Sequence, residues 1–319
     1  MSTTVRSTTG ADESAGGMPT PIARAAKPRR TRQRPYHKRG SGDFSRPTLG
    51  GLIGRYALLL VVTVIVIGPL VWQLSTAFKG PGDDIYNFPP NFIPTDPTLD
   101  NFVRVTDFIP VYLYAFHSLL VALGTVLTNT VLATFAGYAI GCMKFKGKKI
   151  VMGILLSTLL LPGEVTLTSQ FLTIRSLGLA DSLWGVFLPG AIGAMNVLLV
   201  ATACRAIPTD MLDAATIDGA TTWQRIRHMV WPNVRGMVSV VAVFAFIGAW
   251  DDFLWPLIVL SDPAKYTLTV GMAYLNGNFQ ADPRLIAAGT MVALVPLMIV
   301  FSAMQRFFFK GVEEGAVKG

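Results

Sequence analysis

The side chains that could do chemistry in this sequence are few, and most of them are carboxylates in apolar surroundings. Glu164 follows a Pro-Gly pair within an apolar run, and the adjacent acids Asp251 and Asp252 stand beside Trp250. Paired carboxylates next to an aromatic ring can hydrogen-bond and stack on a sugar. Acids and tryptophans at the end of a membrane helix can equally be solvated interface residues, so both interpretations stay open.

The sequence contains no pattern typical of metal, nucleotide or covalent chemistry. Two cysteines and three histidines lie at scattered positions, without the spacing of metal ligands. It has neither a G-x-x-x-x-G-K-[ST] phosphate loop nor a G-x-S-x-G nucleophile elbow. We therefore expect no catalytic residue, no metal site, no bound cofactor and no ATPase activity in this chain. Cys142 and Cys204 are expected to be reduced packing residues.

The composition excludes an ordinary soluble enzyme. Of the 319 residues, 51% are hydrophobic and 14% charged, whereas soluble domains carry about 25% charged residues. The mean hydropathy of +0.49 is typical of a membrane protein. The net charge of +8 must therefore be interpreted relative to a bilayer, and it does not predict nucleic-acid binding.

Six apolar segments are long enough to cross a bilayer, which takes about 20 apolar residues per helix. They are 52–78, 114–142, 150–171, 183–203, 234–260 and 285–309. The sequence thus predicts an all-α polytopic membrane protein with six transmembrane helices, the first over 52–78. An even number of crossings places both termini on the same side.

The distribution of basic residues sets the expected orientation. Lysine and arginine number 11 through Arg55, four in the 144–149 turn, four over 205–235 and three after residue 305, against five in the opposite loops. Cytoplasmic loops carry this excess, and counting only residues near helix ends still leaves 13 against five. Both termini are therefore predicted to be cytoplasmic. Residues 1–46 are predicted to be a disordered basic cytoplasmic arm that enforces this topology and touches anionic lipid, with a specific partner as the alternative.

A short stretch on the predicted outer side is amphipathic. Leu99, Phe102 and Val103 lie on one side, and Asp100 and Arg104 lie on the other. This pattern predicts a short helix that lies along the membrane surface.

Several small or polar residues lie inside the predicted crossings. Gly137 and Gly141, four positions apart, predict close helix packing. Asn129 and Asn196 could line a path. Glu164 lies about 15 residues into its segment, or about 22 Å along a straight helix. An unpaired charge there is costly, so we expect it to face water or the bundle interior, in a solute path or an interhelical hydrogen bond.

The longest loop on the predicted inner side, residues 205–233, has the pattern of two short helices that meet at a glycine. Pro208 suits a first helical turn, and Gly219 can adopt the left-handed conformation that ends a helix. The threonines after it can cap a second helix, which Pro232 should bound. The two apolar faces are Met211, Leu212 and Ala215, and Trp223, Ile226, Met229 and Val230. Such a unit could dock into another protein or could merely connect two crossings.

The residues of this loop resemble a known motif. The stretch D-A-A-T-I-D-G-A over 213–220, followed by M-V-W-P over 229–232, is similar to the EAA loop of permease subunits of binding-protein-dependent ABC importers. Further stretches resemble the carbohydrate-uptake branch of that family, in particular the second permease subunit of maltose-type importers. They include A-G-Y-A at 136–139, F-K-G-K at 145–148, P-G-E-V at 162–165, L-G-L at 177–179 and W-D-D-F at 250–253.

The resemblance implies a type I ABC importer permease fold in a bacterial plasma membrane, with an ABC transmembrane type-1 domain over 113–306 and a cytoplasmic tail over 310–319. It implies a heterodimer with a homologous permease, two ABC ATPase subunits that hold ATP and Mg, and an extracytoplasmic sugar-binding protein. The loop would fit a cleft of the ATPase and convert its closure into movement of the membrane helices. The residues that take this role are Asp213, Ala214, Ala215, Asp218, Gly219, Ala220, Arg225 and Pro232.

The chain departs from the family pattern within this loop. Asp213 replaces the usual Glu and is one methylene shorter, while Met229 and Trp231 replace the usual Ile and Leu. The candidate residues along a substrate path are Glu164, Asn196, Trp250, Asp251 and Asp252. A self-contained secondary transporter or channel is the alternative, and it would need intramembrane charges for ion coupling. A membrane enzyme would need clustered His, Asp or Cys at one depth, and the sequence contains no such cluster.

Overall fold

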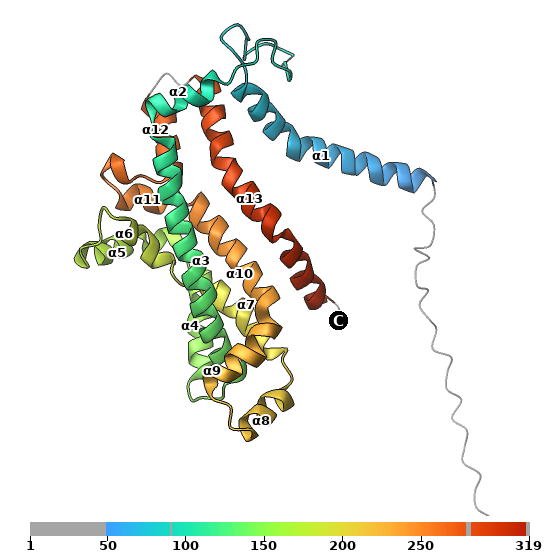
Figure 1. Ribbon diagram of the computed structural model, residues 1–319, viewed down its shortest axis with the longest axis vertical. Helices are drawn as coiled ribbons and strands as arrows, with labels where there is room; N and C mark the ends of the chain where they lie inside the picture. The colour runs from blue at the N-terminus through green and yellow to red at the C-terminus, as the bar shows by residue number, and fades with distance from the viewer. Residues whose placement is uncertain (1–48, 90, 279–281, 317–319) are drawn as a thin grey trace, which may run out of the picture. The chain divides into compact units, whose positions relative to one another are not determined.

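The computed structural model describes residues 49–89, 91–278 and 282–316, and the regular elements in those ranges are helices (Figure 1). They are α1 (Leu49–Ala77), α2 (Asp100–Phe108), α3 (Val111–Cys142), α4 (Lys148–Leu160), α5 (Gly163–Ser176), α6 (Leu183–Phe187), η1 (Leu188–Gly190), α7 (Ala194–Arg205), α8 (Thr209–Ile217), α9 (Thr222–Arg225), η2 (Ile226–Val230), α10 (Trp231–Asp251), α11 (Leu254–Val259), η3 (Pro263–Lys265), α12 (Leu268–Asn278) and α13 (Pro283–Ala316). The chain divides within α1, after Leu58, and the packing described below lies in the part from Leu59 onward.

Five helical spans in the described ranges are long and apolar enough to cross a membrane, and a bent pair makes a sixth. The five are Leu49–Ala77, Val111–Cys142, Leu183–Arg205, Thr222–Asp251 and Pro283–Ala303, and the bent pair is α4 with α5. The prediction of an all-α polytopic membrane protein is confirmed. The expected arm over 1–46 lies outside the described residues.

Two apolar clusters hold the bundle together around α3, α7 and α10, which lie side by side (Figure 1). One cluster lies at the α8–α9 end of the bundle and contains Tyr138 of α3, Val200 of α7 and Val230 of η2. The other lies toward α2, α11 and α12 and contains Tyr114 and Trp255. Buried apolar side chains supply most of the packing free energy of such a bundle's interior.

The predicted close packing at Gly137 and Gly141 is confirmed. A Cβ atom at Gly137 would lie 2.7 Å from Val200 Cγ1, and one at Gly141 would lie 2.5 Å from Cys204 Cβ. Both glycines therefore let α3 approach α7 more closely than any other residue would. The two cysteines also meet here, with the Cys142 thiol donating to the Cys204 carbonyl at 3.4 Å.

The third predicted crossing, 150–171, is wrong as a continuous helix. It breaks between α4 and α5, which are bent by 106°. Pro162 cannot donate a backbone hydrogen bond, and it holds Leu161 in an extended conformation, with φ −87° and ψ 124°. The depth expected for Glu164 assumed a straight helix, so that estimate is wrong too.

The fifth predicted crossing, 234–260, also differs at both ends. The helical span begins at Thr222 and ends at Asp251, and α11 follows as a separate short helix. The expectation that Pro232 bounds the preceding helix is wrong, because the helix passes through it. The π-helical turn η2, in which the Trp231 N–H donates to the Ile226 carbonyl, accommodates the proline without ending the helix.

The amphipathic helix expected around residue 100 forms as α2, but the apolar face was assigned incorrectly. Asn101 and Val105 are buried, and Phe102 packs against the core, whereas Leu99 and Val103 are exposed. The side chain of Asn101 sets this orientation, because it donates to the carbonyls of Ala77 and Lys79 at 3.0 and 2.8 Å. At the C-terminal end, α13 extends to Ala316, beyond the expected end at residue 309.

We expect Gly137→Ala to lower the stability of the purified protein by about 1–3 kcal/mol, because the new methyl group overpacks the α3–α7 contact. Thermal unfolding in detergent measures this change. The control is Gly153→Ala on α4, where a Cβ atom meets nothing within 4 Å. Equal melting temperatures for the two variants would show that the α3–α7 contact is not tight.

Candidate functional site

A cavity of about 520 Å³ lies among α3, α5, α6, α7 and α10. Its wall brings together Glu164, Asn196 and Asp252, three of the five residues predicted to line a substrate path. The other polar side chains on the wall are Thr125, Asn129, Thr166 and Gln170. The cavity therefore presents hydroxyl, amide and carboxylate groups within an apolar bundle, and such a lining can hydrogen-bond a polar solute.

Among the α5 residues that line the cavity, the sequence analysis named Glu164 as a path candidate but not Thr166 or Gln170. Gly163, Thr166 and Gln170 recur at spacings of three and four, which places them on the same helical face as Leu167. This spacing is a readable signal once the helix is known to begin at Gly163. The bend at Pro162 turns that face toward the cavity, and Glu164 lies in the first turn of α5.

Asn129 on α3 is the most completely bonded polar residue on the cavity wall. Its amide donates to the carbonyls of Gly190 at 2.7 Å and Thr125 at 3.0 Å. Its oxygen accepts from the Gly193 N–H and from the Asn196 amide, both at 2.8 Å. These bonds join α3 to the interruption between η1 and α7, where the backbone leaves the helix.

The α11 side of the cavity is fixed by hydrogen bonds from Trp255 and Asp252. The Trp255 indole donates to the carbonyls of Gly185 and Val186, both at 3.2 Å. The Asp252 carbonyl accepts from the Thr269 hydroxyl at 2.7 Å, and its carboxylate accepts from the Trp255 N–H at 3.4 Å. Asp252 is thus held in place by backbone and side chain together.

Trp250 and Asp251 are not brought to the cavity. Trp250 is only 5% exposed, stacks on Phe246 with ring centroids 5.7 Å apart, and donates to the Ala293 carbonyl at 3.2 Å. It packs α10 against α13. Asp251 is the last residue of α10 and is exposed.

An ion pair connects two turns beside the cavity. Lys265 Nζ donates to Asp181 Oδ2 at 2.7 Å, and the backbone N–H groups of Ser261 and Asp262 donate to Asp181 Oδ1 at 2.9 Å. The hydrogen bond from Lys265, reinforced by those two N–H groups, lowers the pKa of Asp181 from 3.8 to about 2. The turn before α6 is therefore tied to the turn after α11, and both helices form the cavity wall.

The second candidate site is the loop at the α8–α9 end of the bundle (Figure 1). Gly219 has φ +75°, the left-handed conformation that the sequence predicted. Thr221 begins α9 with a capping box, in which the Gln224 N–H donates to its hydroxyl and its own N–H donates to Gln224 Oε1. Two short helices thus meet at a glycine, as expected.

The residues of the resemblance motif divide between the surface and the interior of this loop. Asp213, Ala214, Asp218, Gly219 and Pro232 are exposed, Ala220 and Arg225 are half-buried, and Ala215 is buried. The guanidinium of Arg225 donates to the hydroxyls of Thr216 and Thr222, both at 3.2 Å, which joins the two helices. Ile217, which the sequence analysis did not single out, is 86% exposed at the tip.

The buried side of the loop is fastened to the membrane bundle. Ile226 and Val230 belong to the apolar cluster formed with α3 and α7, and Met211 packs against it. Trp223 stacks on Phe135 of α3 with ring centroids 6.2 Å apart. The loop is therefore anchored to the bundle through its apolar faces, while its acidic residues point to solvent.

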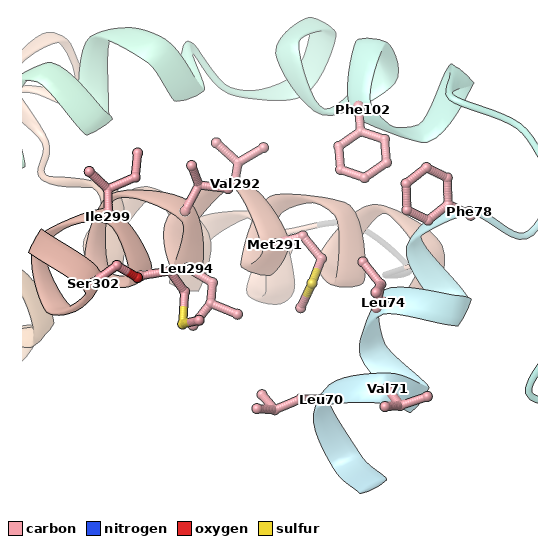
Figure 2. A pocket seen from close by; sticks show the side chains of 12 residues that line it. Leu70, Val71, Leu74, Phe78, Phe102, Met291, Val292, Leu294, Ile299 and Ser302 are labelled. Carbon is pink, nitrogen blue, oxygen red and sulfur yellow. The ribbon is translucent and has the colours of Figure 1, made fainter. Parts of the chain in front are cut away.

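A second and larger hollow has a different character. It is an apolar groove of about 890 Å³. Figure 2 shows side chains that line it, among them Leu74 of α1, Phe102 of α2 and Met291 of α13. Ser302 is the one side chain with a polar group among its twelve lining residues. Because hydrocarbon walls offer no hydrogen bonds, this groove is unsuited to a polar solute.

Interrupted apolar spans around a polar cavity, with an anchored two-helix loop at one end, are the architecture of a membrane permease. Residues 94–314 match the family described as the inner membrane component of binding-protein-dependent transport systems, and the chain belongs to that family.

Three curated relatives show what this chain is similar to. The galactooligosaccharides transport system permease protein GanQ of Bacillus subtilis is 29% identical over 84% of this chain and 96% of its own length. The diacetylchitobiose uptake system permease protein NgcG of Streptomyces coelicolor is 27% identical, over 82% and 88%. The maltodextrin transport system permease protein MdxG of Bacillus subtilis is 27% identical, over 83% and 95%.

Solved structures support the same fold. A chain of a bacterial ABC transporter involved in the import of the acidic polysaccharide alginate superimposes with a TM-score of 0.71. It is 19% identical and covers 80% of this chain and 95% of its own. A bacterial alginate ABC transporter in complex with an alginate pentasaccharide-bound periplasmic protein gives a TM-score of 0.58 at 16% identity.

We expect Asn129→Leu to destabilise the protein by about 1–3 kcal/mol for each backbone group left unpaired at the interruption before α7. Thermal unfolding of the purified protein measures this loss. The matched control is Asn233→Leu, because Asn233 is exposed and donates only within its own helix, to Met229. If the two variants unfold at the same temperature, Asn129 does not hold the interruption together.

A pH dependence follows from the Asp181–Lys265 pair. A carboxylate whose pKa falls on folding contributes stability above its unfolded pKa and loses it as the pH falls through the folded pKa. The difference in melting temperature between the native protein and Asp181→Asn should therefore be full above pH 3.8 and shrink toward pH 2. A difference that stays constant over this interval would contradict the pairing.

Proposed function

We propose that this chain is a transmembrane permease subunit of an ATP-driven sugar importer. It forms half of the translocation pathway, and it couples to a separate ATPase through the loop over 205–233. The family membership and the sugar-transport names of the relatives support this proposal.

The observation that carries the proposal is one continuous helix. The span Thr222–Asp251 begins within the loop and reaches the cavity, where Phe244, Ala245 and Gly248 form part of the wall. A partner can bias a membrane site only through an element that both sites contact. A helix anchored at one end in the loop and lining the cavity at the other is such an element.

Exposed loop residues provide the proposed contact with the ATPase. Asp213 and Asp218 offer carboxylates, and Ile217 offers an apolar side chain on the exposed tip. Ala214 and Gly219 keep the surface between them small, which allows the walls of a cleft to come close. Asp213, one methylene shorter than Glu, would need a closer approach to a basic partner.

In the proposed orientation, the loop and both termini are cytoplasmic, and the membrane is a bacterial plasma membrane. The excess of basic residues in the regions on the side of the loop supports this orientation. The opposite side would face an extracytoplasmic sugar-binding protein, and a homologous permease would complete the pathway. The alginate-transporter complex that contains a periplasmic protein supports the binding-protein partner.

Sugar would pass the cavity that Glu164, Asn196 and Asp252 help to line. Hydroxyl-rich solutes need donors and acceptors in the wall, and these three residues supply carboxylate and amide groups. ATP and Mg would bind to the partner ATPase subunits.

Purification of the tagged chain from native membranes in mild detergent tests this proposal. We expect a second permease, an ATPase with a phosphate-binding loop and a sugar-binding protein to co-purify. A chain recovered alone, in an assembly that transports without any ATPase, would instead support a self-contained secondary transporter or channel.

We expect Gly219→Pro to abolish sugar uptake while the chain still inserts and assembles. Proline fixes φ near −65°, so it cannot adopt the positive φ of this turn, and the two loop helices would separate. Uptake of labelled sugar and the amount of assembled complex are the two measurements. The matched control is Gly147→Pro, which disturbs another positive-φ turn outside the loop. Normal uptake by the Gly219 variant would rule out the coupling role.

A further inference from the structure

The segment between α1 and α2 is a loop, here named the strap, whose two ends are joined at its base by backbone hydrogen bonds. The Gly80 N–H donates to the Asp96 carbonyl at 2.7 Å, and the Thr98 N–H donates to the Phe78 carbonyl at 2.8 Å. Inside this base, the Asp83 carboxylate accepts from the backbone N–H groups of Thr95 and Asp96, each at 3.1 Å. The rest of the strap, residues 85–94, of which residue 90 lies outside the described residues, is termed the aromatic segment.

The aromatic segment exposes large apolar side chains without any charge among them. Its sequence, I-Y-N-F-P-P-N-F-I-P, contains no acidic or basic residue. Tyr86 is 81% exposed, Phe88 95% and Ile93 81%. Contact with water is unfavourable for these apolar side chains, and the hydrogen bonds at the base hold the strap in place. Such a cluster therefore indicates a contact surface.

The position of Phe92 sets the depth of this surface. Its ring meets that of Trp72 edge-on, with centroids 5.5 Å apart and an interplanar angle of 76°. The Lys79 ammonium lies 4.3 Å from the Trp72 ring centroid on the same helix end, which helps to hold that ring. Trp72 precedes the end of α1 at Ala77 by five residues, or about 7.5 Å at 1.5 Å per residue. The aromatic segment therefore folds back to the level of the outermost turns of a membrane span.

The backbone of the segment suits a partly dehydrated environment. Three of its ten residues, at positions 89, 90 and 94, are prolines, which have no N–H to leave unpaired. The first N–H of the exposed cluster, that of Tyr86, donates to Asp84 Oδ1 at 2.8 Å. Fewer unpaired donors lower the cost of placing a loop at the bilayer interface.

We propose that the aromatic segment is a lipid contact that inserts Tyr86, Phe88 and Ile93 into the interfacial region of the leaflet where α1 ends. Tyrosine is favoured at this level because its ring is apolar and its hydroxyl can stay in water, and the apolar side chains of Phe88 and Ile93 can reach the acyl chains. The surface is continuous with α1, whose apolar side chains are exposed as far as Leu74. The acidic residue Asp84 immediately precedes the segment and is exposed. This contact does not depend on the proposed sugar transport.

Photo-crosslinking in native membranes tests the lipid contact. A benzophenone amino acid replaces Phe88 in the full chain, expressed together with its partner subunits, and the products are identified by intact mass. We expect adducts with the mass of a phospholipid, at a yield severalfold above that from the same probe at Asp84. Asp84 is the matched control because it is exposed on the same strap but lies before the uncharged aromatic segment.

A second measurement keeps the test independent of the probe's effect on folding. In nanodiscs whose phospholipids carry brominated acyl chains, Phe88→Trp should add a strongly quenched component to the tryptophan emission, and Asp84→Trp should add an unquenched one. Crosslinks from position 88 to another protein chain, or equal quenching at the two positions, would overturn the lipid contact.

Discussion

Inside a bilayer, each backbone N–H and C=O must find its partner within the protein, because lipid offers none. The cavity lies where the helices fail to supply that partner. The chain leaves the helix at Leu161 and Pro162, between Gly190 and Gly193, and after Asp251. Side chains from elsewhere supply hydrogen bonds at two of these interruptions. Asn129 bonds the Gly190 carbonyl and the Gly193 N–H, and the Thr269 hydroxyl donates to the Asp252 carbonyl. The same interruptions that open a polar space thus explain which polar residues are buried around it.

One continuous helix joins the loop to the cavity because of how α10 begins. Pro232 would normally end or kink a helix, since it removes a hydrogen bond and crowds the preceding turn. The π-helical turn over Ile226–Val230 shifts the bonding pattern before the proline, and the helix continues into the membrane. Ile226 and Val230 on that turn are also buried against α3 and α7. Under the proposed function, a displacement of the loop is passed along this helix to the cavity wall.

Much of this arrangement follows from local sequence, and the remainder depends on contacts between distant residues. Apolar length predicted the spans, and the glycines at 137 and 141 predicted that their helix packs closely on another one, because both patterns are properties of a single helix. Its partner, α7, was known only from the structure. The turn at Gly219 and its threonine cap were likewise local. The 106° bend after Leu160 was not predicted, because a proline weakens a helix without specifying the angle at which the chain resumes.

In the candidate site, too, some features follow from local sequence and others depend on contacts between distant residues. Glu164, Asn196 and Asp252 were predicted as candidates along a substrate path, and the structure places all three around the same cavity. Trp250 and Trp255 flank the same pair of acids in sequence, yet Trp250 packs toward α13 and Trp255 lines the cavity. The two indoles have partners 43 and 70 residues away, and no local pattern encodes those distances.

The proposed coupling requires the helix from Thr222 to Asp251 to link the loop to the cavity as a rigid element. The most direct test is the distance between spin labels at these two exposed ends, about 43 Å for a straight helix at 1.5 Å per residue. It would be measured in the assembled transporter, without nucleotide and with an ATP analogue that arrests the ATPase. A single narrow distribution, the same in both states, is the predicted result. A distribution that shifts or splits with nucleotide would mean that the helix hinges at the π-helical turn and does not transmit movement from the loop to the cavity.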